Sequence, residues 1–400
     1  QANPKLGILQ SLITGLPATS AFARVFQFGM RHGMRSYTTG SAWWQGDEGP
    51  YWGHNAIIRL KPFREHCRLP RLSGRAPLGG EILSHDQIEA VMMRSAGYDV
   101  RVLPLEDGSF EENPPTLQDF MKRDLRWCQG NVQYLKLLWM PGVRPLGRLQ
   151  ILLAIMMYTA APVWYAFMIT GLAQLVVDAL TYKTTLHDEI MGPFLTPMAE
   201  MSGGVTLFVV ILTMNFAPKV LGVIDVMLRP EERRRYGGAS ALAIGALVEA
   251  LFSVLIAPVA ALAQTIFLGG LFLGRKVTWD AQERDQRSVS IGDAFRGLWP
   301  QTLMGIGFAT SLWVLAPEFL VWGAPVTLSL LLAAPFSSIT SRPDVGRVFA
   351  KAGLCSIPEE QAPPLELIWL GYGLELFDRL PQSAILGKTI SSIQTGEQGD

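Results

Sequence analysis

Residues 149–177 read LQILLAIMMYTAAPVWYAFMITGLAQLVV, a stretch of 29 positions without a charged side chain. A helix needs about 20 predominantly apolar residues to cross the ~30 Å hydrocarbon core of a lipid bilayer. The stretch therefore predicts a membrane span. It also separates a polar region of the chain, residues 1–146, from a more apolar region that follows it.

The composition of the whole chain agrees with a membrane protein. Hydrophobic residues make up 49% of the sequence and charged residues 17%, whereas typical globular domains carry about 25% charged residues. Lys plus Arg and Asp plus Glu are equal at 34 each, so no net charge favours nucleic acid, and we expect no nucleic-acid binding. The three cysteines, Cys67, Cys128 and Cys355, are far apart and match neither a disulfide framework nor a zinc site, which predicts reduced thiols.

Further apolar windows predict that the second region crosses the membrane several times. Stretches with almost no charge cover residues 201–224, 237–274 and 297–341. The loops at 229–235 and 275–296 are rich in Arg and Lys, whereas the loop at 178–200 holds one lysine among four acids. The excess of positive charge in cytoplasmic loops places the first two inside and the third outside.

Both longer windows should therefore be pairs of spans. The segments on both sides of residues 237–274 are basic and should be cytoplasmic, so the chain must cross the membrane twice between them. This predicts a break between two spans near Pro258. Glu249 should then face protein and not lipid. A break at residues 316–318 divides 297–341 in the same way. The prediction is six spans within 147–341, a cytoplasmic region at 1–146, and a cytoplasmic tail at 342–400 that is loosely packed from Ala350.

Residues 1–146 predict a layered α/β fold. Residues 6–9, 56–58 and 100–103 are apolar runs of strand length, and residues 86–96 have apolar side chains at helical spacing before Gly97. Helices and strands that alternate along a chain in this way pack as layers, with the helices against a sheet. The predicted fold class is thus α/β plus membrane α-helical.

Three short segments concentrate the polar groups of this region. They are DEGPYWGHN at 47–55, SHD at 84–86 and RDLRWCQGN at 123–131. The chain has no Gly-rich phosphate loop, no His-Glu-x-x-His, no Gly-x-Ser-x-Gly and no Asp-x-Asp motif. Any chemistry should therefore come from the three segments.

Together the segments resemble the processive family-2 glycosyltransferases, which include cellulose and hyaluronan synthases. Residues 46–55, 82–86 and 126–131 are most similar to the bacterial glucosyltransferases that make osmoregulated periplasmic glucans. The resemblance covers essentially residues 1–350. It implies the second half of a glycosyltransferase A-type domain joined to a helical membrane bundle, in the bacterial inner membrane with the catalytic region in the cytoplasm.

The resemblance also implies a reaction and its partners. Glucose would pass from UDP-glucose to a growing β-glucan acceptor, whose backbone linkage would be β-1,2, beside membrane lipid and a periplasmic protein that processes the glucan. Mg²⁺ or Mn²⁺ would be needed, but its Asp-x-Asp ligands would lie upstream of Gln1, so no metal ligand is assigned here. The chain begins without a signal-peptide pattern, and we expect it to be the later part of a longer protein.

Asp86 is the residue that the resemblance assigns as general base, with His85 in place of the acid that precedes the base in the family. A carboxylate at the start of a helix can be directed at an acceptor hydroxyl and take its proton. The alternative is that Asp86 only caps the helix. His85 and His54 could be structural histidines. Glu89 could form surface or local helix contacts.

The Arg-Trp segment is the second part of the predicted site. Arg126, with Arg123 in place of the family's Gln, would contact the donor pyrophosphate, because a guanidinium binds phosphate with two parallel hydrogen bonds. Trp127 would stack on the acceptor sugar, although it could instead pack at the membrane interface. Asp124 is expected to form surface or local helix contacts.

The remaining assigned residues complete the acceptor side. Trp52 and His54 would bind the acceptor, and Trp43, Trp44 and Trp52 are either core residues or a carbohydrate-facing surface. Lys276, Val277 and Thr278 resemble a gating loop, although a basic loop against lipid headgroups is an equal alternative.

Two other functions fit the same sequence. One is a noncatalytic polysaccharide-binding membrane subunit. The other is a transporter with a regulatory cytoplasmic domain, for which Glu249 and Glu318 are the only acids within the apolar windows.

Overall fold

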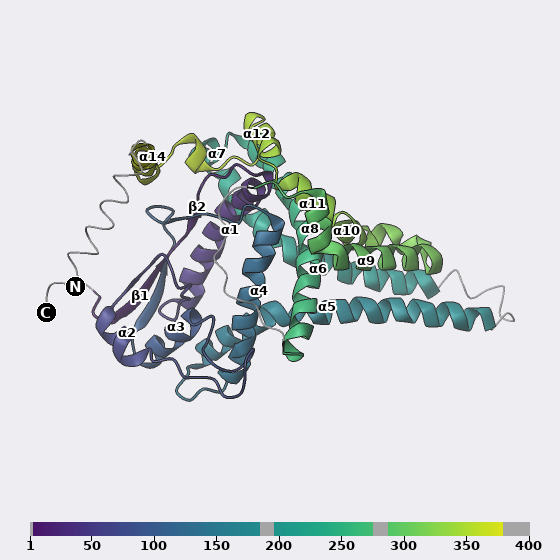
Figure 1. Ribbon diagram of the computed structural model, residues 1–400, viewed down its shortest axis with the longest axis horizontal. Coiled ribbons are helices and arrows are strands. Elements are labelled where there is room, and N and C mark those ends of the chain that lie inside the picture. The colour runs from purple at the N-terminus through teal and green to yellow at the C-terminus, as the bar shows by residue number, and fades with distance from the viewer. Residues whose placement is uncertain (1–2, 185–195, 275–286, 379–400) are drawn as a thin grey trace.

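The computed structural model describes residues 3–184, 196–274 and 287–378 (Figure 1). A small α/β region lies at one end, and several helices, among them α5, α9 and α10, extend away from it. The elements in chain order are β1 (Leu6–Ser11), β2 (Thr14–Gly15), α1 (Ala21–Gln45), β3 (Ala56–Ile58), α2 (Leu60–His66), α3 (Asp86–Ser95), β4 (Asp99–Leu103), β5 (Phe110–Glu111), α4 (Leu117–Gln133), η1 (Tyr134–Lys136), α5 (Pro145–Thr184), α6 (Thr196–Leu228), α7 (Pro230–Arg235), α8 (Ala239–Phe272), α9 (Ile291–Leu315), η2 (Pro317–Phe319), α10 (Leu320–Leu331), α11 (Ala333–Thr340), α12 (Pro343–Lys351), α13 (Pro358–Gln361) and α14 (Leu365–Asp378).

The α/β region is built on a three-stranded sheet. Strand β1 lies in the middle, antiparallel to β3 and parallel to β4. Helix α3 covers the sheet, because Ala90 and Met93 on its apolar face pack against Ile8 and Val100 of the two parallel strands. The strands predicted at 6–9, 56–58 and 100–103 and the helix predicted at 86–96 are confirmed.

Three of the described helices are long and apolar enough to cross a membrane, namely α5, α6 and α8. Helices α10 and α11, bent by 57° at their junction, could together make a fourth. The predicted break at residues 316–318 is confirmed, since α9 ends at Leu315 and η2 separates it from α10. The count of six spans is not confirmed.

The predicted break near Pro258 is wrong, because α8 runs through this proline without interruption. Proline has no N–H, so the carbonyl four residues earlier loses its partner inside the helix. Here the Ser329 hydroxyl of α10 donates to that carbonyl, on Val254, at 2.9 Å. Packing of this kind between neighbouring helices is how apolar helices tolerate an internal proline.

Glu249 faces protein, as predicted. Its side chain on α8 is buried and accepts hydrogen bonds from Lys219 of α6 and, at 2.7 Å, from Ser253. A Cβ on Gly29 of α1 would lie 2.7 Å from a carboxylate oxygen of Glu249, so the glycine allows the two helices to approach. A buried charge needs such a partner to be tolerated among apolar helices.

One hydrophobic core joins the α/β region to the apolar helices. Its largest cluster contains Phe22 and Phe28 of α1 together with Phe252 of α8 and Leu298 of α9. Helix α8 contacts α1 and α4 of the polar region as well as the apolar helices α5, α6 and α10. The polar and apolar regions of the chain therefore pack as one unit.

The prediction that the tail is loosely packed from Ala350 is wrong for the residues that follow directly. Cys355 and Ile357 belong to the same core. Glu360 accepts hydrogen bonds from both terminal nitrogens of Arg24, at 2.7 and 2.8 Å. The sequence of this segment is polar and rich in proline, but its acids are paired with arginines of α1 that lie more than 300 positions earlier.

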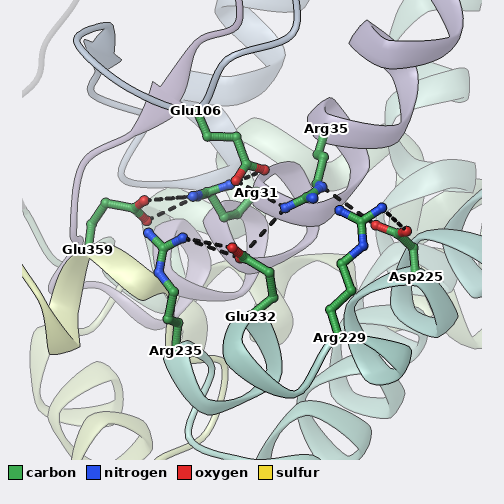
Figure 2. Close-up of polar contacts among 8 residues, drawn as sticks. All are labelled: Arg31, Arg35, Glu106, Asp225, Arg229, Glu232, Arg235 and Glu359. Atoms are coloured by element: carbon green, nitrogen blue, oxygen red, sulfur yellow. Dashed lines mark hydrogen bonds and ion pairs between the residues drawn. The ribbon is translucent and has the colours of Figure 1, made fainter.

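A network of arginines and acids fixes this packing (Figure 2). Arg31 of α1, which is almost fully buried, pairs with Glu359 of α13 at 2.9 Å and with Glu106 of the loop after β4 at 2.6 Å. Arg35, one turn further along α1, pairs with the same Glu106 at 3.2 Å and with Asp225 of α6 at 3.5 Å. The network thus joins four segments that are distant in sequence.

Arg31→Met should destabilise the protein by about 3–5 kcal/mol, because it leaves the buried Glu359 carboxylate without this cation and removes one of the two arginine partners of Glu106. The unfolding temperature of the detergent-solubilised protein measures the effect. Arg71→Met is the control, since Arg71 pairs with Glu81 at 3.4 Å where both side chains are largely exposed, and such pairs contribute little. Equal unfolding temperatures for the two variants would show that the network does not stabilise the fold.

Candidate active site

The loop at residues 47–55 is held on the sheet by Gln10 of β1. The buried Gln10 amide accepts a hydrogen bond from the Trp52 backbone N–H at 2.9 Å and donates to the carbonyls of His54 and Asn55 at 3.0 and 3.2 Å. Gly53 has a φ of +83°, which favours glycine. One side chain therefore fixes the backbone on both sides of Gly53.

Gly53 brings this loop against the predicted base. A Cβ on Gly53 would lie 2.1 Å from Oδ1 of Asp86, so only glycine leaves room for the carboxylate. Asp86 is the first residue of α3, and His85 occupies the N-cap position. The alternative that Asp86 is the N-cap is therefore wrong.

Burial raises the pKa of Asp86 above its ordinary value, an effect that nearby His85 opposes and the Glu89 charge reinforces. The His85 ring lies 3.3 Å from Asp86 and 3.1 Å from Glu89. The hydrogen bond with Glu89 raises the pKa of His85. Glu89 makes the local contact expected of it, but it is buried and adjoins the Asp86 site, which the sequence did not reveal.

Helix α4 holds the segment that leads into Asp86. Gln133 accepts a hydrogen bond from the Leu83 N–H at 2.9 Å, and the Tyr134 hydroxyl donates to the Ser84 carbonyl. A Cβ on Gly130 would lie 2.0 Å from the Ser84 hydroxyl oxygen. Gly130 of the third polar segment, together with the end of α4 and the start of η1 directly after it, thus positions the second segment, a role that the sequence analysis missed. A glycine inside a helix, which costs about 1 kcal/mol relative to alanine, was the available signal.

Arg123 and Trp127 lie together on α4. The Arg123 guanidinium carbon is 4.9 Å from the Trp127 ring centre, and Arg123 also lies 3.8 Å from Glu111. Glu111 is in turn 3.8 Å from the His54 ring. This series of contacts connects the Arg-Trp segment to the loop that touches Asp86, so the structure brings all three polar segments together.

The other predicted site residues differ in exposure. Trp127 is 44% exposed, Trp52 is half-buried beside the Tyr37 ring, and His54 is exposed. Arg126 is half-buried on α4. Trp43 and Trp44 are exposed, so the alternative that they are core residues is wrong. Lys276, Val277 and Thr278 lie outside the described residues.

Asp124 makes contacts well beyond its own helix. It accepts hydrogen bonds from Gln264 of α8 at 2.7 Å and from Tyr158 of α5 at 3.4 Å. Burial raises the pKa of Asp124. The expectation of surface or local helix contacts is therefore wrong, and Asp124 ties the Arg-Trp segment to two candidate membrane helices.

Among the described residues, one group of side chains has the proximity of a metal site, namely His85, Asp86 and Glu89. It is a poor fit for Mg²⁺, which favours oxygen ligands in octahedral geometry. The His85 nitrogen is already paired with Glu89, and a histidine with a raised pKa holds a proton more readily than a metal. We therefore derive no step through a metal ion bound to this group.

Comparisons with known proteins identify the family to which the chain belongs. Residues 2–217 match the family model described as glycosyl transferase family group 2. The chain is 39% identical over 368 residues to the glucans biosynthesis glucosyltransferase H of Pseudomonas putida, covering 92% of this chain and 43% of that relative. It is 40% identical over 366 residues to the protein of the same name from Klebsiella pneumoniae, covering 91% and 43%. The chain thus spans less than half of the length of these curated relatives.

Proposed function

Because the chain belongs to glycosyl transferase family group 2, we propose that it forms the acceptor side of a membrane glucosyltransferase. Glucose passes from UDP-glucose to a growing β-glucan with a β-1,2 backbone. The observation that carries the proposal is the contact between Gly53 and the Asp86 carboxylate, inside a cluster that also contains the Arg-Trp segment. The protein lies in the bacterial inner membrane with this site on the cytoplasmic side.

Asp86 acts as the general base. Its carboxylate takes the proton of an acceptor hydroxyl while that oxygen attacks the anomeric carbon of the donor glucose. The bond from this carbon to the UDP oxygen breaks, and UDP leaves with the electron pair. The raised pKa of Asp86 makes the carboxylate a stronger proton acceptor than an ordinary aspartate.

The two arginines of α4, Arg123 and Arg126, have different roles in the proposed reaction. Arg126 contacts the pyrophosphate of the donor and offsets the charge that develops on it. Arg123 is already paired with Glu111 and packs on Trp127, so its part is to hold the indole as a platform for the acceptor sugar. A divalent metal such as Mg²⁺ or Mn²⁺ would supply charge neutralisation at the donor pyrophosphate, and no described residue is assigned as its ligand.

Incorporation of labelled glucose tests the proposal. Inverted membrane vesicles that contain the complete protein should form polymer from UDP-[¹⁴C]glucose, and vesicles without the protein should not. A protein that binds or transports polysaccharide without making it would give no donor-dependent label in polymer. That result would favour the noncatalytic or transport alternatives.

Trp127→Ala should lower kcat/KM for the acceptor on the order of tenfold, which corresponds to about 1.4 kcal/mol of lost stacking energy, and should leave UDP-glucose binding unchanged. Trp139→Ala is a matched control, because Trp139 is also exposed and also carries an arginine, Arg148, 5.7 Å from its ring centre. Equal losses in both variants would mean that Trp127 serves only as a surface or membrane-interface residue.

A further inference from the structure

Gln150 connects the first candidate membrane helix to the α/β region. It lies near the start of α5 and is 7% exposed. Its amide nitrogen donates to the Glu48 carbonyl at 2.8 Å, and its amide oxygen accepts from Arg94 at 2.6 Å and from Gln87 at 3.1 Å. A single side chain of the membrane helix thus makes three hydrogen bonds to the polar region.

Arg94 is the second part of this arrangement. It lies in the last turn of α3 and is almost fully buried. One of its terminal nitrogens donates to the carbonyls of Glu48 and Gly49 as well as to Gln150. A buried guanidinium that binds backbone carbonyls fixes the path of the loop, since moving the loop would leave the charge without partners.

The hydrogen bonds of Gln150 and Arg94 hold two parts of the proposed active site, helix α3 and the loop at residues 47–55. Helix α3 carries Asp86 at its first residue and Arg94 in its last turn. The loop that Arg94 and Gln150 hold at Glu48 continues to Gly53, which touches Asp86. Gln87, bonded to the same Gln150 oxygen, is the neighbour of Asp86 along the chain.

We infer that Gln150 is a positioning residue, through which helix α5 sets the placement of the 47–55 loop relative to the general base. The inference rests on the proposed function. Gln150 makes none of its three bonds to Asp86 itself, and its effect passes through the loop backbone and α3. A misplacement of about 1 Å can cost roughly 100-fold in rate, so small shifts at Gln150 should matter.

Gln150→Met is the decisive variant, because methionine has nearly the same size but forms none of the three hydrogen bonds. In vesicles with the complete protein, we expect kcat for polymer synthesis to fall about 10- to 100-fold while KM for UDP-glucose stays within about twofold. Gln301→Met is the matched control, since Gln301 is a buried glutamine of α9 whose amide oxygen has no partner. It should retain kcat within about twofold.

Gln150→Glu provides a second test if the methionine variant does not fold. It keeps the two acceptor contacts, adds a negative charge beside Arg94, and turns the bond to the Glu48 carbonyl into a repulsive contact between two oxygens, so kcat should fall several-fold with KM unchanged. Native kcat in either folded variant, or a loss of donor binding equal to the loss of kcat, would overturn the inference. If the unaltered protein forms no polymer, the proposed function itself is wrong. This outcome is distinguishable from a failure of the Gln150 inference, in which the unaltered protein is active and the Gln150 variants are equally active.

Discussion

Asp86→Asn is expected to reduce glucan synthesis by at least about 10²-fold and up to about 10⁴-fold, the range that a positioned general base contributes. Asparagine keeps the size of the side chain and fits beside Gly53, but it cannot accept the proton of the acceptor hydroxyl. UDP-glucose binding should be unchanged. Polymer formation from labelled donor and donor binding, measured on the same preparation, separate the two effects.

The pH dependence gives an independent check on the base. Because burial raises the pKa of Asp86, activity should fall as pH is lowered through a value above that of an ordinary aspartate. The folded state then holds this proton more tightly than the unfolded state, so Asp86 lowers stability as pH rises through the same window. Asp86→Asn removes the destabilising effect of the ionised, buried carboxylate, so it should not lower the unfolding temperature at neutral pH.

The control must lie outside the site. Glu89→Gln, one turn after Asp86, is unsuitable, because Glu89 is buried and pairs with His85. Asp99→Asn is suitable, since Asp99 at the start of β4 pairs with Arg101 at 2.9 Å where the arginine is half-exposed. Asp99→Asn should stay within about twofold of native activity. Near-native synthesis by Asp86→Asn would show that another group takes the proton.

Three strands and the helix α3 of the α/β region could be predicted from sequence, because each of them has a local signal. The strand at 6–9 is a short apolar run, and the helix from Asp86 has its apolar side chains at helical spacing. The three polar segments were also found from the sequence, and the structure places them next to one another. These predictions need only residues that are neighbours in the chain.

The failures share the opposite cause. The path of α8 through Pro258 depends on the Ser329 hydroxyl, and the packing of Glu359 depends on Arg31, each from a distant part of the chain. The link from Gln150 to the 47–55 loop is of the same kind. Hydropathy and charge along the sequence show that a proline inside a helix, or an acid in a core, is unfavourable by itself. The distant side chain that bonds the freed carbonyl or pairs with the acid can be seen only in the three-dimensional structure.

Gly53→Ala is expected to lower glucan synthesis by about 10²-fold, because a Cβ at this position would overlap the Asp86 carboxylate. The carboxylate or the loop must move, and either movement displaces the base from the acceptor. Gly97→Ala is the matched control. Gly97 has a φ of +87°, close to the +83° of Gly53, but a Cβ there would meet no atom within 4 Å. Both variants carry similar backbone strain, and only Gly53→Ala should lose activity.

A double variant tests whether the loss at Gly53 passes through Asp86. If the alanine acts by displacing the base, it should cost little further activity in the Asp86→Asn background, because the group that it displaces no longer takes a proton. If it acts instead by disturbing Trp52 and His54 on the same loop, the two losses should multiply. Rates of polymer synthesis for the two single variants and the double variant decide between these outcomes. A multiplicative loss would mean that the contact between Gly53 and Asp86 is structural, and that the loop binds the acceptor independently of the base.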